Sequence, residues 1–197
     1  MKIALLSDMH WNWINHFWFT LDDFKKCDLI LSLWDNYKED LEILKDLNIP
    51  KLAVHWNNDL IRKWKEDWLK DYWFQNIHLK TVDINWIKIW WIEWNMWLLF
   101  AESIPNLWNN KMNRFKDELV QIKSNLKFAN IIISHFPIYS IHDNIHSWSH
   151  KWLRVCLNLL ENKNLKYFFH WHLHKSEETK IWNILVKQSY WVEIIEI

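Results

Sequence analysis

The chain contains no glycine, although it has 197 residues. An ordinary domain has about 7% glycine, because tight turns need residues that tolerate positive φ angles. The chain has 19 tryptophans instead, and Asn85-Trp86 and Trp182-Asn183 lie where Asn-Gly or Gly-Asn is the usual hairpin signal. We interpret most or all of the tryptophans as standing for glycine. Two explanations stay open, namely UGA codons that the source organism reads as glycine, and deliberate substitution.

Net charge is absent too, because 24 basic side chains balance 24 acidic ones. No global field therefore favours nucleic acid or an anionic membrane as a partner. No apolar run reaches membrane-spanning length, and the one at the N-terminus is too short for a signal peptide. The only cysteines, Cys27 and Cys156, are far apart and read as reduced, mostly buried thiols. We expect a cytoplasmic protein that binds no membrane.

A chain of this length predicts a single domain over residues 1–197. Strand-like and helical patterns alternate from Lys2 to about Asp71, which predicts parallel strands joined by right-handed crossovers. Antiparallel strands follow, with one hairpin turning at Asn85-Trp86 and another near the end of the chain. Helices are expected at Phe17–Lys26, Glu39–Leu47, Leu60–Lys70, Lys111–Phe128 and Lys151–Leu160, and the closing strands at Thr179–Val186 and Tyr190–Ile197.

Five apolar strand-like runs stop at polar residues. The clearest is Leu29–Trp34, which is followed at once by Asp35. Because parallel strands place their carboxyl ends at one edge of a sheet, where α/β proteins carry their ligands, we expect these polar residues to converge. The candidate metal ligands are Asp8, His10, Asp35, Asn57, His135, His172 and His174.

This mixture of carboxylate, amide and imidazole ligands suits Mn²⁺, Fe, Zn²⁺, Ni²⁺ or Co²⁺ better than Ca²⁺ or Mg²⁺. Seven ligands are too many for one ion, so we expect two ions that share Asp35. Only Asp8 and Asp35 are anionic, so the centre keeps a net positive charge and attracts phosphate. Such a centre would also supply a bridging hydroxide for in-line attack on phosphorus.

These residues resemble the calcineurin-like metallophosphoesterase superfamily. Its motifs run Asp-x-His, Gly-Asp, Gly-Asn-His-Asp/Glu, a lone His and Gly-His-x-His. They appear here in order as Asp8-Met9-His10, Trp34-Asp35, Trp56-Asn57-Asn58-Asp59, His135 and Trp171-His172-Leu173-His174. The resemblance implies an α/β fold, an αβ-sandwich of two mixed β-sheets flanked by helices. It also implies a dinuclear centre, with Mn²⁺ favoured. By resemblance, Asp8, His10, Asp35 and His174 hold one ion, and Asp35, Asn57, His135 and His172 hold the other.

The third motif departs from the family, because Asn58 stands where a histidine is thought to protonate the leaving group. An amide cannot supply a proton near neutral pH. The departure resembles the small single-domain phosphodiesterase branch and favours diesters with activated or cyclic leaving groups. Asp59 is expected to orient its neighbours. His150, in the loop His146–Trp152, is the preferred residue for phosphate contact or proton supply, so Asn58, Asp59 and His150 are the candidate catalytic residues.

The leading prediction is a metal-dependent phosphodiesterase acting on a small phosphoester. One alternative is a non-catalytic scaffold of the same fold, recruited for protein interaction, but such a scaffold would have lost ligands and all seven are present here. Phosphomonoesterase and nuclease activities are further alternatives. Neutral charge and the lack of a basic, aromatic-interleaved stripe disfavour the nuclease. The remaining histidines have a weaker case: His170 is read as structural support, and His142 and His146 as members of a polar surface loop.

Overall fold

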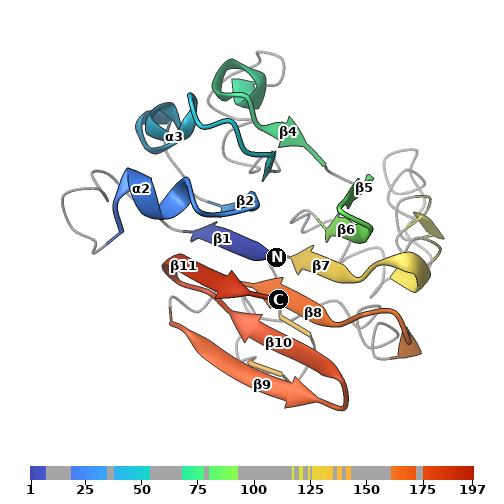
Figure 1. Cartoon of the computed structure of the whole chain (residues 1–197). Helices are drawn as coiled ribbons and strands as arrows, with labels where there is room; N and C mark the ends of the chain where they lie inside the picture. Colours follow the sequence, from blue (N-terminus) through green and yellow to red (C-terminus); the bar gives the residue numbers. More distant parts are fainter. Residues whose placement is uncertain are drawn as a thin grey trace, which may run out of the picture. The chain divides into compact units, whose positions relative to one another are not determined.

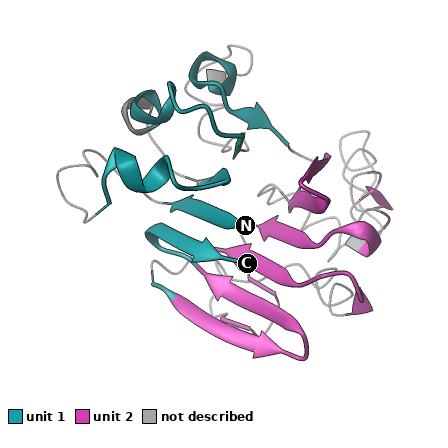
Figure 2. Ribbon diagram, viewed as in Figure 1, with its two compact units in different colours: residues 1–78, 173–176, 189–197 teal, residues 79–172, 177–188 magenta. Residues whose placement is uncertain are grey.

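The computed structural model describes residues 1–7, 19–34, 38–53, 68–77, 80–92, 117, 120–121, 124, 126–134, 137–138, 141–142, 161–171 and 175–197. The chain divides into two compact units (Figure 2). Unit 1 comprises residues 1–78, 173–176 and 189–197, and unit 2 comprises residues 79–172 and 177–188. Each unit contains one β-sheet. The expectation of a single domain over residues 1–197 stays a prediction.

The sheet of unit 1 has five strands in the order β11-β1-β2-β3-β4 (Figure 1). Its strands are β1 (Lys2–Ser7), β2 (Leu29–Trp34), β3 (Lys51–Ala53), β4 (Gln75–Asn76) and β11 (Trp191–Glu196). Strands β1 to β4 are parallel, and β11 pairs with β1 in the antiparallel direction. The predicted parallel arrangement of the first strands is therefore confirmed.

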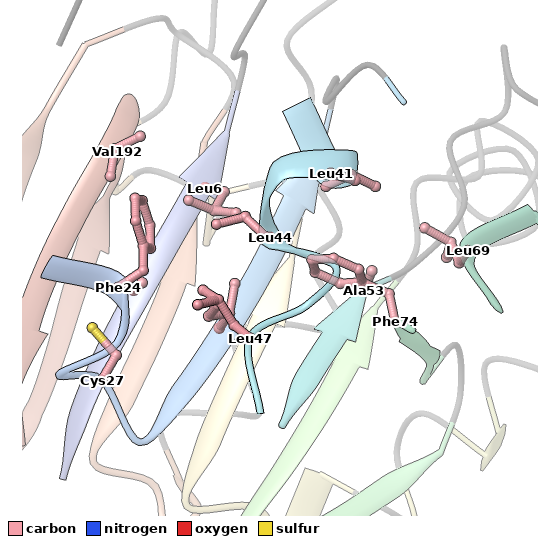
Figure 3. Packing of buried hydrophobic residues seen from close by; sticks show 12 residues of the cluster. Leu6, Phe24, Cys27, Leu41, Leu44, Leu47, Ala53, Leu69, Phe74 and Val192 are labelled. Carbon is pink, nitrogen blue, oxygen red and sulfur yellow. The ribbon is translucent and has the colours of Figure 1, made fainter. Parts of the chain in front are cut away.

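Two short helices share a hydrophobic core with this sheet, α2 (Leu21–Phe24) and α3 (Lys38–Leu44). Ala4 and Leu6, two residues apart on β1, belong to the same buried cluster as Phe24 of α2 and Leu44 of α3 (Figure 3). Successive side chains of a strand point to opposite faces, and the intervening Leu5 is fully buried as well. Burial of both faces explains why the strand reads as an unbroken apolar run.

Both helices are shorter than the sequence predicts. Helix α2 begins after Thr20, whose backbone N–H and hydroxyl each donate a hydrogen bond of 2.8 Å to the Asp23 carboxylate. These bonds hold the pKa of Asp23 below its usual range. Helix α3 ends at Leu44, and the buried Lys51 ammonium then donates to the carbonyl oxygens of Leu47 and, at 3.4 Å, Ile49. The lysine thus satisfies carbonyls of the connection between α3 and β3.

The sheet of unit 2 has six strands in the order β5-β6-β7-β8-β10-β9. Strands β6, β7, β8 and β10 are parallel, and the edge strands β5 and β9 are antiparallel to their neighbours. Both predicted hairpins are present. The fold is therefore α/β with two mixed β-sheets, as the sequence predicts. The strands are β5 (Thr81–Ile84), β6 (Ile87–Ile92), β7 (Ile131–Ser134), β8 (Tyr167–His170), β9 (Glu177–Ile181) and β10 (Ile184–Gln188).

The remaining expected helices fall largely outside the described residues. The described parts of two of them are the 3₁₀ turns η1 (Trp68–Tyr72) and η2 (Leu126–Phe128), with helical backbone also at residues 117, 120, 121 and 124. Within the described ranges, no helix is long and apolar enough to cross a membrane. Cys27 is a buried free thiol as expected, whereas Cys156 lies outside the described residues.

Four of the six described residues with positive φ are tryptophans, Trp73, Trp86, Trp182 and Trp191. Trp73 follows η1 at φ 64°, and its N–H bonds to the Lys70 carbonyl while the Phe74 N–H bonds to the Leu69 carbonyl. This pair of bonds is the Schellman motif, in which the residue at the position of Trp73 is usually glycine.

The two hairpin turns repeat the pattern. Asn85 and Trp86 both have positive φ, at 51° and 69°, as a two-residue type I′ turn requires. In the turn of the second hairpin only the first residue, Trp182, has positive φ, as in a type II′ turn that prefers glycine there. The indoles of Trp86 and Trp182 are 93% and 73% exposed, so they gain little from packing.

Two other tryptophans, Trp90 and Trp91, are consecutive residues of β6, and both are fully buried. Neither indole N–H has a hydrogen-bond acceptor among the described residues. A buried tryptophan usually finds such an acceptor, and a buried donor without one costs about 1–3 kcal/mol. Trp91 also meets the edge of the buried Trp171 ring, with centroids 5.9 Å apart.

Candidate metal centre

All the candidate metal ligands and catalytic residues lie outside the described residues. They are Asp8, His10, Asp35, Asn57, Asn58, Asp59, His135, His150, His172 and His174. Within the described ranges, no three His, Cys, Asp or Glu side chains gather as a metal site would require. The strand ends that precede the candidates in the chain are described, so their registers carry the evidence.

In unit 1, β1 and β2 end opposite each other. Leu6 pairs with Ser32, but Ser7 pairs with Trp34, so β2 has one extra residue at this point. Such a bulge shifts the register by one, and bulges are frequent beside active sites. The next residue of the chain is Asp8 after Ser7 and Asp35 after Trp34. The two motif carboxylates thus follow a pair of register partners.

Ser7 is fixed at this strand end by side-chain hydrogen bonds as well as by the sheet. Its hydroxyl is fully buried and donates to the carbonyl of Ser189 at 3.2 Å, with the Trp191 carbonyl at 3.5 Å. Next along the sheet, β3 ends at Ala53, which pairs with Ser32, and the third motif begins three residues later at Trp56. Three neighbouring parallel strands therefore each precede one of the first three motifs.

In unit 2, a row of residues crosses the strand ends. Ser134 of β7 pairs with His170 of β8, which pairs with Gln188 of β10. All three polar side chains are fully buried. His135 directly follows Ser134, and His172 is two residues after His170. The fourth and fifth motifs therefore also follow neighbouring parallel strands, as the sequence predicts for these strands.

His170 makes a contact that the sequence does not predict. Its Nε2 lies 3.1 Å from Nδ1 of His142, whose Nε2 lies 2.8 Å from the hydroxyl of Thr179 on β9. The sequence predicts a structural role for His170 and a place in a polar surface loop for His142, and it predicts no role for Thr179. His142 is in fact half-buried, and its backbone has a positive φ of 52°. No local pattern marks Thr179, because its partner lies 37 residues away.

The donor set fits divalent metal ions. Carboxylate, amide and imidazole groups follow the ends of adjacent parallel strands in each sheet, and adjacent strands lie about 4.8 Å apart. Imidazole nitrogen and carboxylate oxygen bind such ions at about 2.0–2.2 Å, so side chains from neighbouring strand ends can reach one ion.

No family model and no curated protein match this sequence. Solved structures do match over almost the whole chain. An archaeal phosphodiesterase is 14% identical with a TM-score of 0.52, covering 100% of this chain and 93% of its own. A dimetal phosphatase from Danio rerio is 10% identical with a TM-score of 0.53, covering 98% and 91%. GAP50, the anchor in the inner membrane complex of Plasmodium, is 15% identical with a TM-score of 0.52, covering 95% and 70%.

These likenesses show the fold. The chain shares its α/β fold of two mixed β-sheets with the archaeal phosphodiesterase and the dimetal phosphatase, and this is the fold that its motifs predict. At this level of identity a likeness shows the fold alone.

Proposed function

We propose that this chain is a metal-dependent phosphoric ester hydrolase, and more narrowly a phosphodiesterase. One observation carries the proposal. A bulge in β2 makes Ser7 and Trp34 register partners, so the motif residues Asp8 and Asp35 directly follow a pair of partners in the chain. A fold shared with a phosphodiesterase and a dimetal phosphatase supports it.

The proposed centre takes two divalent ions, with Mn²⁺ as first choice and Fe, Zn²⁺, Ni²⁺ or Co²⁺ as alternatives. Asp35 is shared between them. Asp8, His10 and His174 complete one ligand set, and Asn57, His135 and His172 complete the other. The ions would supply an activated water as nucleophile and would clamp the phosphoryl oxygens.

The other candidate residues act on the substrate. Asn58 can donate a hydrogen bond to a phosphoryl oxygen but cannot protonate a leaving group. Substrates whose leaving group departs without a strong acid, such as aryl or cyclic phosphodiesters, therefore fit this site better than alkyl monoesters. Asp59 orients its neighbours, and His150 contacts phosphate or supplies a proton. We assign the natural substrate only to the class of small phosphoesters.

The test is a substrate panel on protein stripped with a chelator and then loaded with Mn²⁺. Aryl phosphodiesters and cyclic nucleotides should be hydrolysed faster than aryl monoesters, and chelation should abolish turnover. Calorimetry on the same protein should count two Mn²⁺ ions per chain. If the protein neither binds Mn²⁺, Co²⁺, Ni²⁺ or Zn²⁺ nor hydrolyses any substrate in their presence, the proposal is wrong. A strong preference for monoesters would overturn the role given to Asn58.

A non-catalytic scaffold is the second candidate. The structural neighbour GAP50 is an anchor by its description, so a non-enzymatic role on this fold has a precedent. The presence of all seven candidate ligands favours the enzyme. The substrate panel described above distinguishes the enzyme from the scaffold, because a non-catalytic scaffold would show no metal-dependent turnover with any substrate class.

We also infer that tryptophan occupies glycine positions in this sequence. Trp73, Trp86 and Trp182 lie at the turn positions that favour glycine, with positive φ and exposed side chains. A non-glycine residue in this region costs about 1–2 kcal/mol, and these exposed rings gain little packing in return. The buried indole N–H groups of Trp90 and Trp91, without acceptors in the described part of the chain, support the same inference.

The origin of the tryptophans has a direct measurement. If the source organism reads UGA as glycine, the intact protein purified from it is lighter than the printed sequence by one tryptophan-to-glycine difference at each such position. Peptide mapping would place the differences at Trp73, Trp86 and Trp182 first. A native mass that matches the printed sequence would rule this origin out.

A further inference from the structure

We propose that His142 is a positioning residue for the metal centre, acting through His170 on the two segments that carry His135 and His172. The proposal rests on the proposed function, because those two histidines are its assigned ligands. The evidence lies entirely within unit 2, in the contacts of His142, His170 and Thr179.

Ser134 and His142, which flank His135 in the sequence, both lie next to His170. Before His135, Ser134 is the register partner of His170 in the parallel pair β7–β8. After it, the chain turns through a hydrogen bond of 2.9 Å from the Ile141 N–H to the Ile138 carbonyl. His142 then bonds to the His170 ring at 3.1 Å. Ser134 and His142, which flank the seven residues 135–141 in the sequence, are therefore both held next to His170.

His170 is fully buried at the end of β8, held between β7 and β10, and its ring lies near the Phe168 ring with centroids 5.9 Å apart. His172 is only two residues further along the chain. One side-chain contact, His142 to His170, thus connects the segments of two ligands assigned to the same ion.

The contact between His142 and His170 can form with both imidazole rings neutral. A neutral imidazole has one N–H and one acceptor nitrogen. If His170 Nε2 donates to His142 Nδ1, then His142 Nε2 donates to the Thr179 hydroxyl. If His142 Nδ1 donates instead, its Nε2 accepts from that hydroxyl. Both arrangements satisfy the two nitrogens of His142.

The backbone of His142 adopts an uncommon conformation. Its φ of 52° is sparsely populated by residues other than glycine, asparagine and aspartate, although histidine is found there more often than most. Such conformations persist where the surroundings over-determine them, and they cluster at functional sites. At His142 the surroundings include the two ring contacts, with His170 and with Thr179.

The test compares Mn²⁺ binding by calorimetry in the parent chain and in His142→Ala, His142→Asn and Thr179→Val. Loss of a partner that orients metal ligands costs about 10–100-fold in affinity. His142→Ala should therefore weaken one of the two Mn²⁺ sites by that factor and leave the other unchanged.

Asparagine tolerates positive φ and its amide can replace Nδ1, so His142→Asn should recover most of the affinity. Thr179→Val, which removes only the outer contact, should have a smaller effect. Lys180→Ala, an exposed neighbour of Thr179 on β9, is the control and should bind as the parent does.

Parent-like affinity in His142→Ala would overturn this inference alone and leave the proposed function standing. Equal losses in His142→Ala and His142→Asn would also overturn it, because the contact with His170 would then not be the cause. A parent chain that binds no Mn²⁺ would overturn both. Thermal unfolding of each metal-free variant shows whether a loss of affinity merely follows from a loss of fold.

Discussion

Ser7 and Trp34 lie opposite each other in the β1–β2 pair because β2 has one residue more than β1 at that end. In an uninterrupted register Ser7 would oppose Leu33, and the positions after the two strands would be offset by one residue. The bulge removes this offset. The first carboxylate of each strand-end motif, Asp8 and Asp35, therefore follows the same rung of the sheet.

The first prediction concerns the shared carboxylate. Asp35→Asn should weaken both Mn²⁺ sites, whereas Asp8→Asn should weaken one. The loss for Asp35→Asn should exceed the roughly hundredfold loss caused by removing outer partners of metal ligands. Calorimetric titration with Mn²⁺ measures both the affinity and the number of ions. Asp83→Asn, on the exposed strand β5, is the control. Two sites of parent affinity in Asp35→Asn would contradict the dinuclear assignment.

The second prediction concerns leaving-group protonation. Asn58→His introduces a group that can donate a proton near neutral pH, and such a group contributes about 10²–10⁴-fold when it is positioned correctly. Turnover of alkyl phosphomonoesters should therefore rise relative to aryl phosphodiesters. Asn58→Gln is the control, because it keeps an amide and cannot act as an acid. The kcat ratio of the two substrates measures the effect, and a ratio that does not move would argue that Asn58 is remote from the leaving group.

The third prediction concerns the hairpin turn of β5 and β6. Trp86→Gly and Trp86→Ala both remove an indole that is 93% exposed, but only glycine relaxes the positive φ of 69°. Trp86→Gly should be more stable than Trp86→Ala by about 1 kcal/mol in urea unfolding. The same pair of substitutions at Trp73, in the Schellman motif, should differ in the same direction. Equal stabilities at both positions would show that the backbone is not strained there.

The fourth prediction concerns pH. Burial lowers the pKa of Lys51 from its ordinary value of 10.5, while Asp46 opposes the shift. Between the folded and unfolded pKa values the unfolded chain binds more protons, so stability rises with pH in that window. Burial of the charged Lys51 ammonium therefore lowers the free energy of unfolding at neutral pH, and this destabilisation disappears as pH approaches 10.5. The urea midpoint of Lys51→Met should lack this rise, whereas the exposed control Lys127→Met should keep it.

Strands and hairpins were predictable because their signals are local. Runs such as Leu29–Trp34 are apolar on both faces, which only a strand buried on both sides requires. Asn85-Trp86 marked the first hairpin once tryptophan was interpreted as glycine. The helices were predicted too long: a side chain such as Lys51, which binds the carbonyls after α3, acts from outside the helix pattern.

The structural supports around the candidate site leave no pattern in the sequence. Five motifs in order along the chain predict the ligands, and that assignment stays a prediction, whereas the bulge at Leu33 depends on pairing between strands and leaves no mark in β2. The contact of His142 with His170 spans 28 residues, and that with Thr179 spans 37. Contacts between residues so far apart in the sequence depend on the topology of the sheet. No local sequence pattern marks them, because the topology is a property of the whole fold.

The exposed turn tryptophans would give the protein an optical signature. Water around Trp86 and Trp182 would shift their fluorescence to the red and leave them open to iodide quenching, while the buried Trp90 and Trp91 would emit in the blue and resist it. Replacing both turn tryptophans by glycine would therefore reduce the quenchable red component, to which the exposed Trp73 also contributes, and leave the blue component in place.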